Sequence, residues 1–109
     1  MHTVLEVLQY TLKEGAGIQF HCVMLTQSIP LHKKCGLKVV AYGNSLDNPD
    51  KYLLIRAFPD TEKMEKELEV FYSDEQWHNG PRTAILSMIE QSHRVLLNES
   101  VFLSNSLQF

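Results

Sequence analysis

The sequence predicts an α+β domain built in the order β-α-β-β-α-β. Four segments are rich in apolar and β-branched residues and are bounded by turn residues, as strands are. Helical sequence lies between the first and second of these segments and again between the third and fourth. Only turn residues, at 43–50, join the second segment to the third, which makes them an antiparallel hairpin. The chain of 109 residues fits one domain, 1–109.

The first strand and the first helix are expected at the start of the chain. The strand covers 4–12, and the helix covers about 16–27 with a buried stripe at helical spacing. The stripe consists of Ile18, Cys22, Leu25 and Ile29. Pro30 must kink or break the helix. A short turn follows, and Gly36 suits the left-handed position that ends a helix.

Two more strands and a second helix are expected next. The strands cover 37–42 and 51–58, and both are rich in apolar residues. Asp60 can cap the helix that covers 61–72. The buried stripe of this helix consists of Met64, Leu68 and Phe71.

The last part of the chain is expected to hold a broken helix and the fourth strand. Ser73-Asp74-Glu75-Gln76 has the pattern of a capping box and starts a short turn that carries Trp77. Pro81 suits a first helical position, so a helix is expected over about 82–91 and a strand over 94–103. Together the elements predict the ferredoxin-like plan, a four-stranded antiparallel sheet with helices on one face.

All four expected strands carry apolar residues on both faces. The third strand shows this best: Leu53, Ile55 and Ala57 share one face, and Tyr52, Leu54 and Phe58 share the other. An antiparallel sheet with one wet face alternates apolar and polar residues instead. Two helical segments cover only one face, so we expect a homodimer that packs sheet against sheet. The alternative is a monomer with scattered surface hydrophobic residues.

Charge and composition exclude several classes of partner. The net charge is −3 and no basic stripe is present, so nucleic acid is not an expected partner. No apolar run approaches the roughly 20 residues of a membrane span. No secretory signal is visible, and Cys22 and Cys35 are expected to be free thiols in a reducing compartment. These features favour a cytoplasmic protein.

Residues 5–15, 52–60 and 71–82 carry motifs that are similar to those of a known family. The most specific is 71–82, where an aromatic pair is followed by a tryptophan and then by Gly-Pro-Arg. On these residues the chain resembles NIPSNAP-family domains over nearly its whole length. It departs from them at Glu14, where the family usually has proline, and at Leu8, where it often has arginine.

The resemblance implies a dimeric α/β barrel, in which two ferredoxin-like subunits pack sheet to sheet. This agrees with the apolar residues on both faces of the strands. Relatives with the same fold include cofactor-free monooxygenases and haem-degrading enzymes. The strand-one asparagine of the haem degraders is not evident in this sequence.

The fold commonly holds a pocket between its helices and its sheet. The side chains able to line such a pocket are Tyr10, His21, His32, Tyr42, Arg56, Trp77 and Arg82. An apolar wall with a few polar groups suits a small ligand. The histidines show neither HExxH nor Cys-His spacing, so neither a metal site nor another cofactor is expected.

Each of these residues also has a structural interpretation. His21 is either a base or a histidine at the edge of the core, and His32 alternatively lies at the surface. Trp77 either anchors the helix break or offers its N–H to a ligand. Arg82 at a helix start needs a partner, which is either a structural carboxylate or an anionic ligand. Arg56 is expected to pair with Glu6, because a charge in the middle of an apolar strand needs pairing.

Three functions follow from these residues, and the sequence does not decide whether the chain is an enzyme. The first is a domain that binds a small apolar or aromatic ligand, with cofactor-free monooxygenation of an electron-rich aromatic as its catalytic form. The second is a non-catalytic structural or interaction dimer. The third is a haem-binding protein, which needs a histidine that faces an open apolar cavity.

Overall fold

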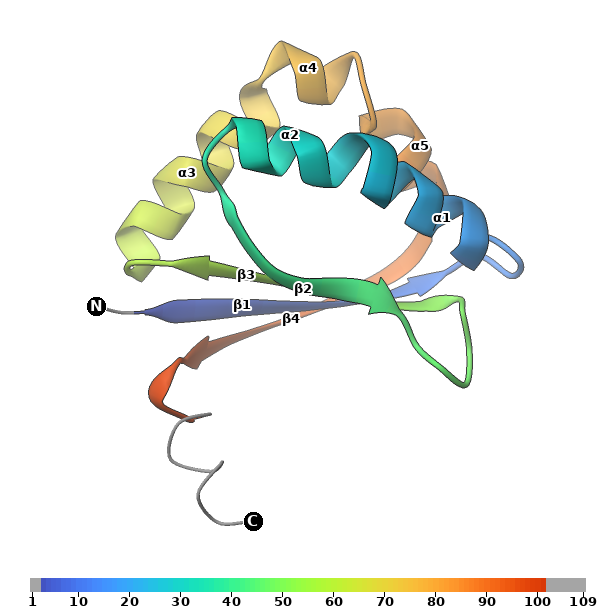
Figure 1. Cartoon of the computed structure of the whole chain (residues 1–109), viewed down its shortest axis with the longest axis horizontal. Helices are drawn as coiled ribbons and strands as arrows, with labels where there is room; N and C mark the ends of the chain where they lie inside the picture. The colour runs from blue at the N-terminus through green and yellow to red at the C-terminus, as the bar shows by residue number, and fades with distance from the viewer. Residues whose placement is uncertain (1–2, 102–109) are drawn as a thin grey trace.

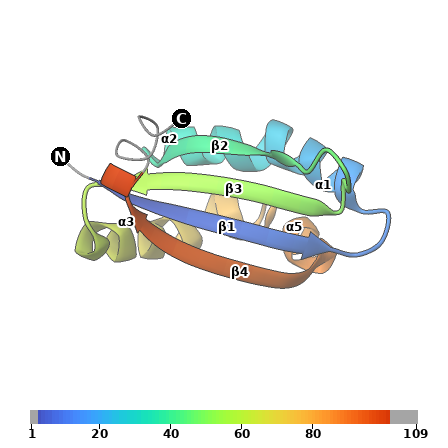
Figure 2. The same cartoon turned by 90° about the horizontal axis from the view of Figure 1, so that it is seen from below.

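The computed structural model describes residues 3–101 and consists of two layers (Figure 1). One layer is an antiparallel sheet of four strands in the order β2-β3-β1-β4. The strands are β1 (Val4–Leu12), β2 (Lys38–Asn44), β3 (Lys51–Phe58) and β4 (Ile89–Asn98). The helices α1 to α5 cover one face of this sheet, and Figure 2 views the sheet from its other face, with the helices behind it. The ferredoxin-like element order predicted from the sequence is confirmed.

The helical layer has two parts. The first is one helical run, made of α1 (Gly17–Val23), a π-helical segment η1 (Met24–Ser28) and α2 (Ile29–Lys34). The second comprises α3 (Thr61–Ser73), α4 (Glu75–His78) and α5 (Arg82–Met88). The core lies between these helices and the sheet. Its largest fully buried apolar side chains are Phe20, Met24, Phe58, Met64 and Phe71.

The stripe predicted for the first helix is wrong at three of its four residues, and only Ile29 packs against the core. Ile18 is 81% exposed and Leu25 is 47% exposed, and Cys22 is an exposed free thiol. The helix buries the opposite face instead, with Gly17, Phe20, Val23 and Met24. A Cβ at Gly17 would lie 2.1 Å from the carbonyl oxygen of Pro49. Only glycine allows this close approach, which turns Gly17 and the residues one turn beyond it toward the sheet.

Pro30 changes the hydrogen bonding of the first helix without ending it. The backbone stays in the right-handed helical region at both ends of the π-helical segment, and the segment leads directly into α2. A π-helical turn widens the helix locally, and this widening precedes the proline, which has no N–H to donate. The turn expected after Pro30 is therefore part of α2. Gly36 follows the helix with φ +81°, as predicted for its end.

The last elements differ in their boundaries from the prediction. Helix α5 ends at Met88 and β4 begins at Ile89, five residues before the predicted start. Glu90-Gln91-Ser92 has no strand pattern of its own, but these residues pair with β1, and the pairing decides their conformation. The predicted strand residues after position 101 lie outside the described residues. The cap before α4 is Asp74 rather than Ser73, since Asp74 accepts from the backbone N–H of Gln76 at 2.7 Å.

The outer face of the sheet is divided into an apolar half and a polar half. Strand pairing aligns Leu5 with Ala57 and Leu97, and Val7 with Ile55 and Val95. Further along the same face, pairing aligns Gln9 with Leu53 and His93, and Thr11 with Lys51 and Gln91. Val95 is 52% exposed. The apolar residues predicted on both faces of the strands are therefore present, although on the outer face they gather at one end.

The predicted cap of α3 gives a direct test of the helix boundary. The Asp60 carboxylate accepts from the backbone N–H of Lys63 at 2.7 Å. We expect Asp60→Ala to lower the free energy of unfolding by about 1 kcal/mol, measured by urea denaturation. Asp60→Asn keeps an acceptor at this position and should lose much less. Equal losses in both variants would contradict a role for the side chain as a cap.

Candidate functional site

A groove of about 840 Å³ opens on the helical side of the sheet. Residues of β1, β3 and β4 form its floor, and residues of α3, α4 and α5 form its walls. The apolar part of the lining consists of Leu8, Leu68, Trp77, Ile85, Leu86 and Ile89. The groove reaches the edge strand β4, where Ser92 and Arg94 are exposed although they face the helical side.

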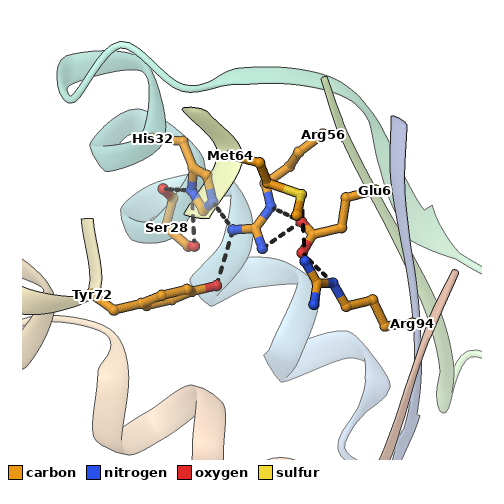
Figure 3. Close-up of polar contacts among 7 residues, drawn as sticks. All are labelled: Glu6, Ser28, His32, Arg56, Met64, Tyr72 and Arg94. Atoms are coloured by element: carbon orange, nitrogen blue, oxygen red, sulfur yellow. Dashed lines mark hydrogen bonds and ion pairs between the residues drawn. The ribbon is translucent and has the colours of Figure 1, made fainter. Parts of the chain in front are cut away.

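A buried ion pair lies at the inner end of the groove (Figure 3). Glu6 on β1 and Arg56 on β3 are paired across the two central strands and are 2% and 1% exposed. Glu6 Oε1 accepts from both Nε and Nη2 of Arg56 at 2.7 Å. Glu6 Oε2 binds Nε of Arg94 on β4 at 3.0 Å. The predicted pairing of Arg56 with Glu6 is confirmed, and Arg94 is an additional partner that the sequence did not indicate.

His32 on α2 contacts the guanidinium of this ion pair. It is 2% exposed, so the surface position considered for it is wrong. Its Nδ1 lies 2.7 Å from the carbonyl oxygen of Ser28, and its Nε2 lies 3.1 Å from Nη1 of Arg56. Because a guanidinium only donates hydrogen bonds, Nε2 must accept and the proton must reside on Nδ1. His32 is therefore neutral, and burial, together with the charge of Arg56, lowers its pKa to about 4.

Two tyrosines bring hydroxyl groups to the same place. Tyr72 on α3 accepts from Nη1 of Arg56 at 2.9 Å, and its ring packs edge to face on Trp77 with centroids 5.2 Å apart. Tyr10 on β1 also lines the groove, and its ring packs on Phe20. Burial, and then the neighbouring Tyr72, raises the pKa of Tyr10 above its usual value. The phenol of Tyr10 therefore stays protonated at neutral pH.

The structure gathers four of the seven candidate residues at this groove: Tyr10, Arg56, Trp77 and Arg82. Trp77 anchors the helix break, as one interpretation expected, and it also lines the groove. Arg82 is exposed, and within residues 3–101 no ion pair or hydrogen bond involves it, so the structural carboxylate expected for it is not found there.

His21 and Tyr42 lie elsewhere. His21 Nδ1 is 2.6 Å from the hydroxyl of Tyr52, and its ring is 6.1 Å from that of Tyr42. Tyr42 lines a second hollow of about 780 Å³ that extends over the polar half of the outer sheet face. The two residues therefore belong to a separate cluster at the far end of the sheet.

Sequence reasoning missed Tyr72 and Arg94. Tyr72 was visible as the second member of the aromatic pair before Trp77. It lies about one helical turn after Glu69 on α3, and both residues line the groove. The sequence predicts Arg94 as the first residue of a strand. Its true place, opposite Leu8 of β1 and on the same face as Glu6, follows from the register of β4.

Neither a metal cluster nor a membrane-spanning helix occurs in the part of the chain that the structure describes. No three His, Cys, Asp or Glu side chains of residues 3–101 gather closely enough to hold a metal ion. None of the helices formed by these residues has the length and apolar character needed to cross a bilayer.

Solved structures reveal what the fold is similar to. A NIPSNAP family protein of unknown function from Agrobacterium tumefaciens superposes with a TM-score of 0.80 at 22% identity, over 89% of this chain and 87% of that one. An uncharacterized NIPSNAP-like domain protein from Burkholderia xenovorans superposes equally well, with 0.80 at 14% identity over 88% and 84%. The chain has a NIPSNAP-like fold.

Solved structures that superpose less closely on this NIPSNAP-like fold include putative monooxygenases. A putative antibiotic biosynthesis monooxygenase from Bordetella bronchiseptica superposes with a TM-score of 0.69 at 15% identity, over 89% of this chain and 96% of that one. The sequence matches no family model, and no curated protein matches it. The likeness therefore lies in the fold, and the function must be argued from the site.

The neutral state of His32 predicts how stability depends on pH. The pKa of His32 is about 4 in the folded chain and about 6.5 when unfolded, so the unfolded chain takes up the proton first as the pH falls. Stability is full above about pH 6.5, and we expect a loss of about 3 kcal/mol by about pH 4 from this residue.

Urea denaturation between pH 7.5 and pH 4 measures this loss, and His32→Gln is the matched control that cannot titrate. The variant is less stable at neutral pH because it loses the contact with Arg56, but its stability should fall less steeply with pH. The same pH dependence in both proteins would mean that His32 is not held neutral.

Proposed function

We propose that this chain binds a small aromatic or apolar molecule in the groove between α3–α5 and the sheet, and that it acts as a homodimer. One observation carries the ligand proposal. The groove has apolar and aromatic walls, and a polar cluster built on the Glu6–Arg56 ion pair closes its inner end. Ligand sites typically combine an apolar lining with a few fixed polar groups in this way.

The polar cluster favours binding over catalysis by a histidine base. Both ring nitrogens of His32 are engaged, one by the Ser28 carbonyl and the other by Arg56. A proton acceptor must reach its substrate, and His32 cannot do so without breaking these contacts. For the same reason His32 offers no free nitrogen to a haem iron, and His78, which lines the groove, is exposed on the short helix α4. We therefore do not propose haem binding.

The second part of the proposal rests on the apolar half of the outer sheet face. Leu5, Val7, Ile55, Val95 and Leu97 form a continuous surface across three strands. Val95 is 52% exposed, Val7, Ile55 and Leu97 are half-buried, and Leu5 is already buried in the single chain. Apolar surface that stays exposed in this way typically marks an interface in a soluble protein. A second copy that packs its own sheet here would bury the same residues by two-fold symmetry. A dimer formed for its own sake, without a ligand, is the alternative function that this surface supports.

Filling the groove tests the ligand proposal. Trp77 is the single tryptophan of the chain and lines the groove, so its fluorescence reports on an occupant. We expect 4-phenylbutyrate or 4-phenylbutanamide to change this emission with a dissociation constant of about 1 mM or below. Ser92→Phe places a ring in the groove from β4 and should abolish the change.

Gln91→Phe is the matched control, because Gln91 precedes Ser92 on the same strand and does not line this groove. Binding by neither compound to the wild-type protein would contradict the ligand proposal. Oxygen uptake in the presence of 1-naphthol tests the oxygenase form separately. No consumption of oxygen beyond that of the Ser92→Phe variant would restrict the function to binding.

A charge on the outer face tests the dimer. Val95 is half exposed in the single chain, so Val95→Asp should not unfold it, but the carboxylates of both copies would become buried at the interface. We expect sedimentation velocity to show a dimer for the wild type and a dissociation constant at least about 100-fold higher for the variant. His93→Asp, on the polar half of the same face, is the control and should dimerise normally. A monomeric wild type at high micromolar concentration would overturn this part of the proposal.

A further inference from the structure

Two hydroxyl groups at the inner end of the groove are donors without an acceptor among the described residues. The Tyr72 hydroxyl accepts from Arg56, so its own hydrogen points elsewhere, and no acceptor for it occurs within residues 3–101. The Tyr10 hydroxyl also lines the groove and has no hydrogen-bond partner among the residues that the structure describes. Both phenols stay close enough to influence one another electrostatically. Tyr72 is 38% exposed and Tyr10 is half-buried, so water reaches these donors through the open groove, and a ligand that displaces this water must supply an acceptor.

The same region carries a surplus of positive charge. Glu6 is its single buried carboxylate, and it faces two guanidiniums, those of Arg56 and Arg94. Each oxygen of Glu6 is already occupied by one of them. Arg94 is 46% exposed at its side chain, and its Nη2 contacts only the weak acceptor Sδ of Met64, at 3.4 Å. Arg82, unpaired in the described residues, adds a further positive charge to the lining.

The acidic residues of the groove do not cancel this surplus at its inner end. Glu65 and Glu69 belong to the lining but are exposed side chains of α3. Water screens the exposed charges of Glu65, Glu69 and Arg82 alike, so the buried Glu6 and the two guanidiniums that touch it set the charge at this end. An acceptor that enters between Tyr10, Tyr72 and Arg94 therefore meets a net positive charge.

We infer that the ligand of this groove carries an anionic group, a carboxylate on an apolar or aromatic body, which accepts from Tyr10 and Tyr72 and pairs with Arg94. This rests on the proposed binding function and adds the charge of the ligand to it. The apolar body lies along Leu8, Trp77 and Ile89. The donors are in place before the ligand arrives, because Arg56 and Trp77 hold Tyr72.

A matched pair of probes tests the charge of the ligand. The compounds 4-phenylbutyrate and 4-phenylbutanamide share one shape and differ in charge. We expect the acid to bind about 10-fold more tightly or better, as measured by titration calorimetry and Trp77 fluorescence at pH 7.5. Raising the ionic strength from about 0.05 to 0.5 M should weaken the acid and leave the amide nearly unchanged.

Variants of the chain assign the anion to this end of the groove. Tyr72→Phe removes a donor but keeps the ring, so the acid should bind about 5- to 10-fold more weakly while the amide changes less. Arg82→Gln should weaken the acid alone, and it removes no internal contact of the described chain. Tyr42→Phe and Lys66→Gln remove a hydroxyl and a charge outside the groove and are the matched controls.

The outcomes distinguish a failure of this inference from a failure of the proposed binding function. Equal affinity for the two probes, or tighter binding of the amide, overturns the inference and leaves the binding function in place. An acid preference that survives in both Tyr72→Phe and Arg82→Gln overturns the assignment of the anion to this site. Absence of binding by either probe overturns the binding function and the inference together.

Discussion

The pairing of Glu6 with Arg56 is the constraint on which the site depends. The two residues face each other across the central strands, at a point where a helical protein layer would otherwise demand apolar side chains. Charges this deeply buried are tolerated only when every polar atom finds a partner. His32, Tyr72 and Arg94 are those partners, and they come from the first helical run, α3 and β4, while Ser28 in turn holds His32. One ion pair thus fixes the relative positions of elements that are far apart in the sequence.

The groove exists because the helical layer does not reach the edge of the sheet. The first helical run packs over the side of the sheet that holds the β2–β3 hairpin, and α3, α4 and α5 lie over the side that holds β1 and β4 (Figures 1 and 2). Strand β4 consequently exposes Ser92 and Arg94 although both face the helical side. A polar floor is acceptable at this edge because water or a ligand reaches it, whereas the same residues on β3 would require internal partners.

Part of this arrangement was readable from the sequence. The strand boundaries 4–12 and 51–58, the cap at Asp60 and the pairing of Arg56 with Glu6 follow from local pattern and from the cost of an unpaired charge. The face of the first helix did not, since two apolar stripes compete there and the contact of Gly17 with the Pro49 loop decides between them. Arg94 and the start of β4 were missed because pairing with β1 overrides local propensity. Long-range contacts of this kind leave no periodic signal in the chain.

The two faces of β4 connect the groove to the outer surface of the sheet. Successive residues of a strand point to opposite faces, so Ser92 and Arg94 meet the groove while His93 and Val95 meet the outer face. As an edge strand, β4 is hydrogen-bonded on one side only, to β1. A partner that packs on Val95 and Leu97 therefore restrains the strand that carries Arg94, the guanidinium bound to Glu6. Because one strand carries both faces, a partner on the outer face would also order the groove, so the proposed dimer and the proposed ligand site would be coupled.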